Sequence, residues 1–228
     1  MTTPIPVPAV PTPPPRPIGL ALLDDHQVVL HGMSIKLRER DDMAVVGAWT
    51  GSRALLESLA TRPVDVLLMD YCLTRDEIDG CQLIALLRTH HPQMRILVVS
   101  AHHSALIVDA ALRAGAHGYV CKTVDWPVLI EAILRVAGNH RYLSQADQDW
   151  FGTDRQLSPR ERDVLRHSLA GDSVSALAER QGLSEKTIST QKRSAYRKLG
   201  LHGDADLFRL APLVYRVLGG EPESGSER

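Results

Sequence analysis

Five short apolar runs, each separated from the next by a segment of helical periodicity, constrain the fold of this 228-residue chain more than any other feature. Short apolar runs are typical of buried strands, and strands that alternate with helices form a parallel sheet covered on both faces. We therefore predict an α/β domain with a doubly wound, parallel, five-stranded sheet in the order 2-1-3-4-5. The second run is the least apolar at its start, which favours an edge position. The expected strands are 18–23, 43–47, 64–69, 95–99 and 117–121, and the expected helices are 27–39, 52–60, 80–90, 104–114 and 126–137.

Polar side chains follow four of these strands. Asp24 and Asp25 follow the first strand, Asp70 the third, Ser100 the fourth and Lys122 the fifth. Taken singly, the aspartates could be a helix N-cap and a loop residue, the serine a helix cap and the lysine a solvated charge. Because the carboxyl ends of parallel strands share one edge, however, the five side chains should converge there. Three carboxylates, a hydroxyl and an ammonium suit Mg²⁺ beside a phosphorylatable carboxylate.

Three motifs in this domain carry a family resemblance. The sequences ALLDDHQVVLHG (21–32), LLMD (67–70) and GAHGYVCK (115–122) resemble the receiver domain of two-component response regulators. The resemblance covers about residues 18–137, and every expected site residue is present. It implies a phosphorelay switch whose phosphoryl donor is a sensor histidine kinase or a phosphotransfer protein.

The resemblance also implies roles for the strand-end residues. Asp70 would accept the phosphoryl group, while Asp24, Asp25, Asp70 and the carbonyl of Cys72 would bind Mg²⁺. Catalysis of phosphoryl transfer is mostly positioning and charge stabilisation, so a metal ion and a lysine suffice.

Three further residues would act as the switch. Lys122 would stabilise the transferred charge, and Ser100 would donate a hydrogen bond to a phosphoryl oxygen. The ring of Tyr119 would then swing inward and alter the surface of the last two βα units. The alternative for Tyr119 is a static, half-buried aromatic ring.

Two segments depart from the family pattern. Thr74 replaces a proline in the loop after the acceptor, and the loop has two extra residues, with Asp76 and Glu77 among its acidic groups. Thr123, rather than proline, follows the switch lysine, so no cis bond is expected there.

Charge is distributed unevenly along the chain. Residues 1–154 contain 13 Lys and Arg against 17 Asp and Glu, whereas residues 155–218 contain 12 against 7. A basic C-terminal part favours nucleic acid as a partner. The helical signals there agree: Ser158 with Glu161 forms a capping box, and Ser184 caps a later helix that Gly200 ends.

The expected helices beyond residue 157 form a helix-turn-helix. They resemble the DNA-binding domain of the LuxR/NarL/FixJ type over about residues 155–218, and residues 186–201 most resemble the Rcs-type capsule regulators. The resemblance implies that Ser189, Thr190 and Arg193 contact base edges of double-stranded DNA. Other residues of the same helix would bind phosphates, namely Lys186, Thr187, Lys192, Arg197 and Lys198.

A fourth helix is expected over about residues 204–218. It carries a stripe that suits either core packing or dimerisation, formed by Leu207, Leu210, Leu213 and Val214. A homodimer would place two recognition helices about one turn of DNA apart.

The whole chain divides into five parts. We expect a disordered Pro-rich leader (1–17), the receiver domain (18–137), a linker (138–156), the LuxR-type helix-turn-helix domain (157–218) and a disordered tail (219–228). No membrane segment or secretion signal is evident, and three cysteines without metal-ligand spacing suit a reducing compartment. We therefore expect a cytoplasmic protein with no membrane partner.

The leading hypothesis is a transcription factor controlled by phosphorylation, not an enzyme. One alternative is an atypical regulator that acts constitutively or through a partner protein. A second is a phosphohydrolase that uses Asp70 as nucleophile, but Cys72 stands where such enzymes need an acid. A metal site at the paired histidines 90–91 and 102–103 is a weaker alternative, because adjacent side chains point different ways.

Overall fold

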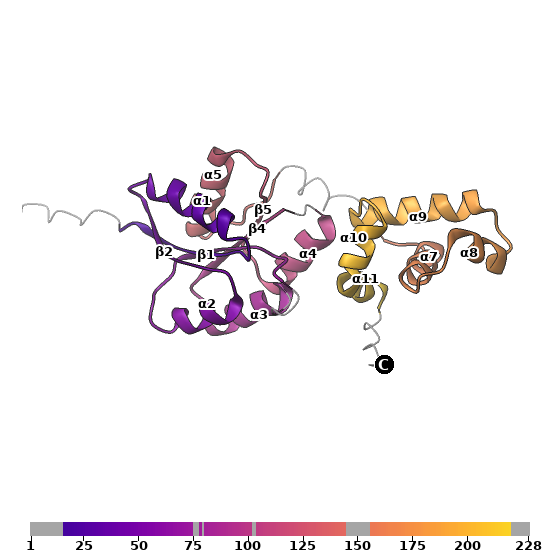
Figure 1. The fold of residues 1–228 in the computed structure, drawn as a ribbon, viewed down its shortest axis with the longest axis horizontal. Helices are drawn as coiled ribbons and strands as arrows, with labels where there is room; N and C mark the ends of the chain where they lie inside the picture. Colours follow the sequence, from indigo (N-terminus) through magenta and orange to yellow (C-terminus); the bar gives the residue numbers. More distant parts are fainter. Residues whose placement is uncertain (1–15, 75–77, 79, 102–103, 145–155, 220–228) are drawn as a thin grey trace, which may run out of the picture.

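The computed structural model describes residues 16–74, 78, 80–101, 104–144 and 156–219. A sheet with helices on both sides forms the N-terminal part of the chain, and a group of helices forms the C-terminal part (Figure 1). Most of the expected leader and tail, and the middle of the expected linker, lie outside the described residues.

The predicted sheet is confirmed. All neighbouring strands are parallel, and their order is β2-β1-β3-β4-β5, with the second strand at an edge as expected. β1 lies between β2 and β3, so the ends of β1 and β3 are adjacent: Leu23 is in register with Met69. The strands are β1 (Ile18–Leu23), β2 (Met43–Trp49), β3 (Val66–Met69), β4 (Arg95–Ser100) and β5 (Gly118–Cys121).

Helices cover both faces of this sheet, as Figure 1 shows. α1 and α5 bury their apolar residues against one face, and α2, α3 and α4 bury theirs against the other. Such burial on both sides explains why the strands are apolar throughout instead of alternating. The helices are α1 (Gln27–Arg38), α2 (Ser52–Leu59), α3 (Gly80–His90), α4 (Ala105–Ala114) and α5 (Trp126–Ala137).

Four strand boundaries differ from the prediction, and the smallest difference is that β5 begins at Gly118, one residue later than expected. β2 extends to Trp49 because its last carbonyl accepts a hydrogen bond from the N–H of Asp24 (3.1 Å). β4 includes Ser100, which pairs with Cys121. β3 begins two residues late, after Asp65, whose carboxylate accepts the N–H of Gly19 at 2.7 Å.

The first part of the expected linker, which starts at residue 138, pairs with the sheet. Tyr142 lies alongside β5, donates its N–H to the carbonyl of His117 and accepts the N–H of Tyr119, both at 3.1 Å. A Cβ on Gly118 would lie 2.8 Å from the Tyr142 carbonyl oxygen, so this approach requires glycine. These contacts cover part of the edge that β5 would otherwise expose.

The C-terminal helices begin and end where their caps predict. Ser158 and Glu161 form the complete capping box, and Ser184 accepts the N–H of Thr187. Gly200 ends the recognition helix with φ +67°, a conformation that favours glycine. These helices are α7 (Pro159–Leu169), α8 (Val174–Gln181), α9 (Glu185–Leu199), α10 (Asp204–Arg209) and α11 (Ala211–Leu218).

The prediction of one continuous fourth helix is wrong. The chain breaks at Leu210, which separates α10 from α11. Pro212 explains the break, because its ring nitrogen has no hydrogen to donate to the preceding turn and its ring clashes with a helical backbone there. The four expected apolar residues are nevertheless all buried, which favours core packing over dimerisation for this stripe.

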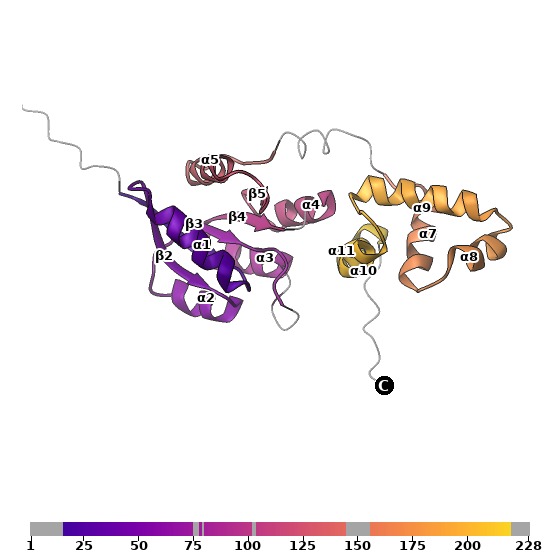
Figure 2. The same cartoon turned by 45° about the horizontal axis from the view of Figure 1, so that its top comes forward.

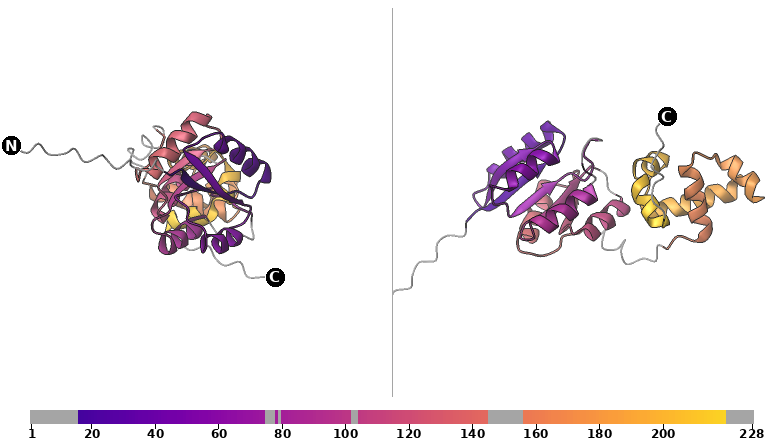
Figure 3. Two further views of the ribbon diagram at one scale, coloured as in Figure 1. Left: turned by 90° about the vertical axis from the view of Figure 1, so that its left-hand side faces the viewer. Right: turned by 90° about the horizontal axis from the view of Figure 1, so that it is seen from below.

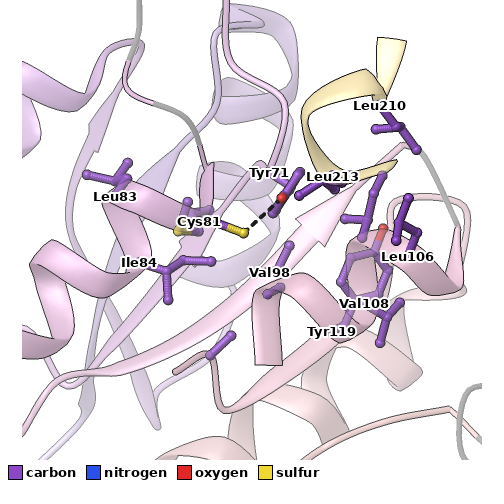
Figure 4. Packing of buried hydrophobic residues seen from close by; sticks show 14 of the residues in the cluster. Tyr71, Cys81, Leu83, Ile84, Val98, Leu106, Val108, Tyr119, Leu210 and Leu213 are labelled. Atoms are coloured by element: carbon purple, nitrogen blue, oxygen red, sulfur yellow. Dashed lines mark hydrogen bonds between the residues drawn. The ribbon is translucent and has the colours of Figure 1, made fainter. Parts of the chain in front are cut away.

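The last two helices also pack against the N-terminal domain. α11 contacts α4, and Figure 3 shows α10 and α11 between the sheet domain and the other C-terminal helices. Leu106 of α4 shares one apolar cluster with Leu210 and Leu213 (Figure 4). A Cβ on Gly200 would lie only 2.8 Å from the backbone nitrogen of Ala105, so the two domains meet closely.

Candidate functional site

Four of the five strand-end residues lie together at one edge of the sheet, as the sequence predicts: Asp24, Asp25, Asp70 and Lys122. Backbone hydrogen bonds position them: the N–H of Asp70 donates to the Leu23 carbonyl at 2.8 Å, and the N–H of Lys122 donates to the Ser100 carbonyl at 2.9 Å. The sheet ladder therefore continues into the residues that carry the polar groups. Figure 2 shows the ends of the strands meeting at one side of the domain.

Lys122 bridges two of the carboxylates. Its Nζ lies 2.7 Å from Asp70 Oδ2 and 2.5 Å from Asp24 Oδ2. Burial alone would lower the pKa of the lysine, but the two carboxylates outweigh burial and raise this pKa above its usual value. The ammonium is therefore charged at any physiological pH, and it offsets part of the negative charge of the pocket.

Three aspartates and one histidine could hold a metal ion. One ligating atom from each of Asp24, Asp25, His26 and Asp70 lies within 4.8 Å of the others. Asp25 Oδ1 is buried and accepts no hydrogen bond within the described structure, although His26 Nδ1 lies 2.8 Å away. Oxygen ligands and an unsatisfied buried carboxylate oxygen fit Mg²⁺ well. The predicted ligand Cys72 donates its N–H to Asp70 Oδ1 at 3.2 Å.

His26 was missed by the sequence analysis, although it directly follows the two aspartates. Its N–H donates to Asp24 Oδ1 at 3.0 Å. His26 is also the N-cap of α1 and gives no side-chain cap, so the interpretation of the aspartates as the cap of this helix is not supported. Likewise Ser104, not Ser100, caps α4.

The two predicted switch residues on β4 and β5 are fully enclosed. Ser100 is 0% exposed and Tyr119 is 1% exposed, so the ring already lies inside the domain and is more buried than the alternative of a half-buried ring expects. Whether the ring moves or is static stays a prediction. Tyr119 packs near Leu106 and Val108 of α4 in the apolar cluster that continues into α11 (Figure 4). A displacement of this ring would therefore be transmitted to α4.

Some predicted features lie outside the described residues. These include most of the altered loop, with Asp76 and Glu77, and the histidines 102–103. His90 and His91 belong to no group of three possible metal ligands in the described chain.

The predicted base-contacting side chains lie on the outer face of α9. Thr190 and Arg193 are exposed, and Ser189 is partly exposed. On the opposite face, four residues are buried, namely Ile188, Ala195, Tyr196 and Leu199. The helix therefore presents one polar face to solvent.

The five basic residues of α9 divide into two groups. Lys186, Arg193 and Arg197 are exposed and have no ion pair with any described residue. Lys192 and Lys198, by contrast, bind partners within the domain. The sequence of α9 does not distinguish these groups, because the partners come from other helices.

Lys198 pairs with a buried carboxylate. Its Nζ lies 2.7 Å from Glu161 Oε2, and Glu161 also accepts the N–H of Ser158 at 2.7 Å. Burial would raise the pKa of Glu161, but Lys198 and the serine hydrogen bonds lower this pKa to about 2. The capping residue of α7 thus also fixes the end of α9.

Lys192 joins α9 to α10. Its Nζ lies 2.8 Å from Asp204 Oδ1, and the hydroxyl of Tyr196 donates to the same oxygen at 2.7 Å. The pKa of Asp204 is lowered by these two partners, against a smaller opposing effect of burial. Burial and the Asp204 carboxylate raise the pKa of Tyr196, so its hydroxyl remains a donor.

Comparisons with known families agree with both parts of this geometry. The response regulator receiver domain family matches residues 20–134, and the family of bacterial regulatory proteins of the luxR type matches residues 155–211. The chain is a DNA-binding two-component response regulator of the LuxR family. Two of the relatives described below, MctR and RcsB, are transcriptional regulatory proteins.

Similar curated proteins span nearly the whole chain. The transcriptional regulatory protein MctR of Rhizobium johnstonii is 32% identical over 200 residues, which cover 85% of this chain and 92% of MctR. The Fimbriae Z protein of Salmonella typhimurium is 30% identical over 86% of this chain and 97% of its own length. The transcriptional regulatory protein RcsB of Escherichia coli K12 is 32% identical over 83% of this chain and 92% of RcsB.

Solved structures of RcsB have the same fold. The structure of an RcsB–DNA complex is 29% identical, with a TM-score of 0.72 over 86% of this chain and 98% of that chain. Salmonella RcsB bound to a promoter with the phosphomimetic BeF₃⁻ is 30% identical, with a TM-score of 0.70 over the same shares of the two chains. None of the described helices is both long enough and apolar enough to span a bilayer.

Proposed function

We propose that this regulator is switched by phosphorylation of Asp70 with Mg²⁺, and that the phosphorylated form dimerises and binds DNA. The observation that carries the proposal is the cluster of three carboxylates in which Lys122 contacts Asp24 and Asp70, with Asp70 Oδ2 2.7 Å from the ammonium. A sensor histidine kinase or a phosphotransfer protein would be the phosphoryl donor. We propose these two kinds of donor because the chain has a receiver domain with a candidate phosphoryl acceptor.

The residues of the pocket would have different roles in phosphoryl transfer. Asp24, Asp25, Asp70 and the Cys72 carbonyl would hold Mg²⁺, which supplies positive charge to the phosphoryl oxygens. One oxygen of Asp70 forms the new bond to phosphorus as the donor's bond to phosphorus breaks in line with it. Lys122 then moves its charge from the Asp70 oxygen to the phosphoryl oxygens.

The signal would leave the pocket through Ser100 and Tyr119. Ser100 donates its hydroxyl to a phosphoryl oxygen, which draws the loop after β4 toward the pocket. Tyr119 lies inward and packs in the cluster with α4 and α11. A change at β4 would therefore alter the surface that the C-terminal domain contacts.

On DNA, α9 would lie in the major groove. Ser189, Thr190 and Arg193 would contact base edges, and Lys186, Thr187 and Arg197 would bind phosphates. The other two predicted phosphate contacts, Lys192 and Lys198, would have to leave Asp204 and Glu161 first. We therefore expect these two lysines to contribute less than the exposed ones.

A homodimer would need a surface other than the predicted stripe, because that stripe is buried within the chain. Phe208 of α10 is 52% exposed and suits such a contact. We also propose that the receiver comprises residues 18–137 together with the strip up to Ser144, and that the DNA-binding domain comprises residues 157–218. The cytoplasm is the compartment that fits these partners.

The test uses the full chain with acetyl phosphate and Mg²⁺. Intact-mass spectrometry should show one added phosphoryl group on the wild type and none on Asp70→Asn. Light scattering should show a dimer only after phosphorylation. The affinity for DNA selected from a random pool should rise when the protein is phosphorylated.

Two results would contradict the proposal. One is the absence of label on Asp70 with unchanged DNA affinity. The other is normal regulation of a target promoter in cells by Asp70→Ala, which would favour the alternative of an atypical regulator. That alternative rests on the altered loop after the acceptor, where Thr74 replaces proline.

A further inference from the structure

A cavity of about 610 Å³ lies where the two domains meet. α3 and α4 of the receiver form two of its walls, and α11 of the DNA-binding domain forms the third. This volume lies in the range of sites that bind small molecules. The cavity is separate from the aspartate pocket and from α9, so neither phosphoryl transfer nor DNA recognition uses it.

Most of the wall is apolar. Ala85, Ala110 and Ala114 expose only methyl groups, and their small size leaves the space open. Leu106 and Leu213 line it from opposite domains. Apolar atoms that face an open space lack packing partners, so an apolar body of suitable size would gain contacts there.

The charges at the cavity do not cancel. Arg113 Nε lies 2.7 Å from Asp109 Oδ2, and these two residues neutralise each other. The third charged residue is Arg216 of α11, whose guanidinium has no hydrogen-bond or ion-pair partner among the residues described. The remaining charge is therefore positive, and a guanidinium binds a carboxylate with two parallel hydrogen bonds.

We propose that this cavity binds a small organic carboxylate with an apolar ring or chain. The apolar body would lie between α3, α4 and α11, and the carboxylate would bind Arg216. Because the walls come from both domains, such a ligand stabilises the arrangement in which the domains touch. The inference does not depend on phosphorylation of Asp70.

The test compares three probes that share one apolar body: 2-naphthoate, 2-naphthol and 2-naphthylmethylammonium. Binding to the full-length protein is measured by titration calorimetry and by the shift of the unfolding temperature. We expect 2-naphthoate to bind at least roughly tenfold more tightly than the ammonium probe, with 2-naphthol between them.

Two variants locate the binding. Arg216→Gln should weaken 2-naphthoate roughly tenfold and leave 2-naphthol unchanged. Ala85→Leu, at an exposed helix position that tolerates leucine, should fill the space and weaken all three probes. Arg135→Gln, on the exposed side of α5, is the matched control and should change nothing.

Any of four results would overturn the inference: no binding of 2-naphthoate, equal binding of the anionic and cationic probes, unchanged binding to Ala85→Leu, or unchanged 2-naphthoate affinity of Arg216→Gln. Asp70→Asn should bind 2-naphthoate like the wild type. A failure of the phosphorylation proposal would therefore be distinguished from a failure of this one.

Discussion

The aspartate pocket and the recognition face of α9 place their charges in opposite ways. In the pocket, four charged residues converge, and Asp24, Asp70 and Lys122 are largely removed from water. On α9, Lys186, Arg193 and Arg197 point outward and have no ion pair in the described structure. Converging charges suit a small ion or a phosphoryl group, whereas separated exposed cations suit a long polyanion.

The role of a charged residue therefore depends on the partners that the fold gives it. Lys122 forms ion pairs with two buried carboxylates, which raise its pKa. The exposed cations of α9 form no ion pair with a described residue, so they are available to bind DNA. Lys198 belongs to α9 by sequence but resembles Lys122 in its environment. The predictions below test whether this division has the expected energetic consequences.

The largest effect is expected from Lys122→Gln. Without the ammonium, Asp24 and Asp70 remain close together, buried and uncompensated, which should lower the free energy of unfolding by about 3–5 kcal/mol. Urea denaturation without divalent cations measures this, and millimolar Mg²⁺ should restore part of the loss. Lys36→Gln, at an exposed pair, should change the stability by less than about 0.5 kcal/mol. Equal stability of the two variants would contradict the comparison.

The next effect is expected at Glu161, the carboxylate that holds Lys198. The pKa of Glu161 is about 2 in the folded protein, below the ordinary value of 4.5. Its charged form therefore stabilises the folded state fully above pH 4.5, and this contribution is lost as the pH falls toward 2. Glu161→Gln should therefore cost about 2–3 kcal/mol at neutral pH. Denaturation at several pH values should show the difference from wild type shrinking in that window. A difference that stays constant would be evidence against the pair.

A smaller effect is expected from Arg193→Ala. Loss of a base contact should weaken binding to the selected DNA site by about 1–3 kcal/mol and reduce discrimination at one base pair. Fluorescence anisotropy with single-substitution sites measures both. Arg135→Ala, on α5, provides the control. Uniform weakening at all sequences would instead assign Arg193 to a phosphate.

The smallest effect separates two lysines of the same helix. Lys186→Gln should reduce the salt slope of DNA binding by about 1, as expected for one lost phosphate contact. Lys198→Gln should leave the slope nearly unchanged and lower the stability, because its ammonium binds Glu161. Equal changes in slope would show that Lys198 leaves its partner on DNA.

Much of the candidate site could be predicted from the sequence. The strand ends at Asp24, Asp70, Ser100 and Lys122 were recognisable, because a buried strand is short and apolar and a polar residue marks its end. His26 was missed, although its position directly after two aspartates was a usable signal. Whether Cys72 provides a metal ligand stays a prediction.

Features that depend on neighbouring residues follow from the amino-acid order: the alternation of strands and helices, the capping box at Ser158, and the glycine that ends α9. Three other features arise only in the folded chain: Tyr142 pairs alongside β5, Lys198 binds a carboxylate 37 residues away, and α11 packs on α4. Local signals act through adjacent backbone groups, whereas ion pairs and apolar contacts form with whichever groups folding brings together.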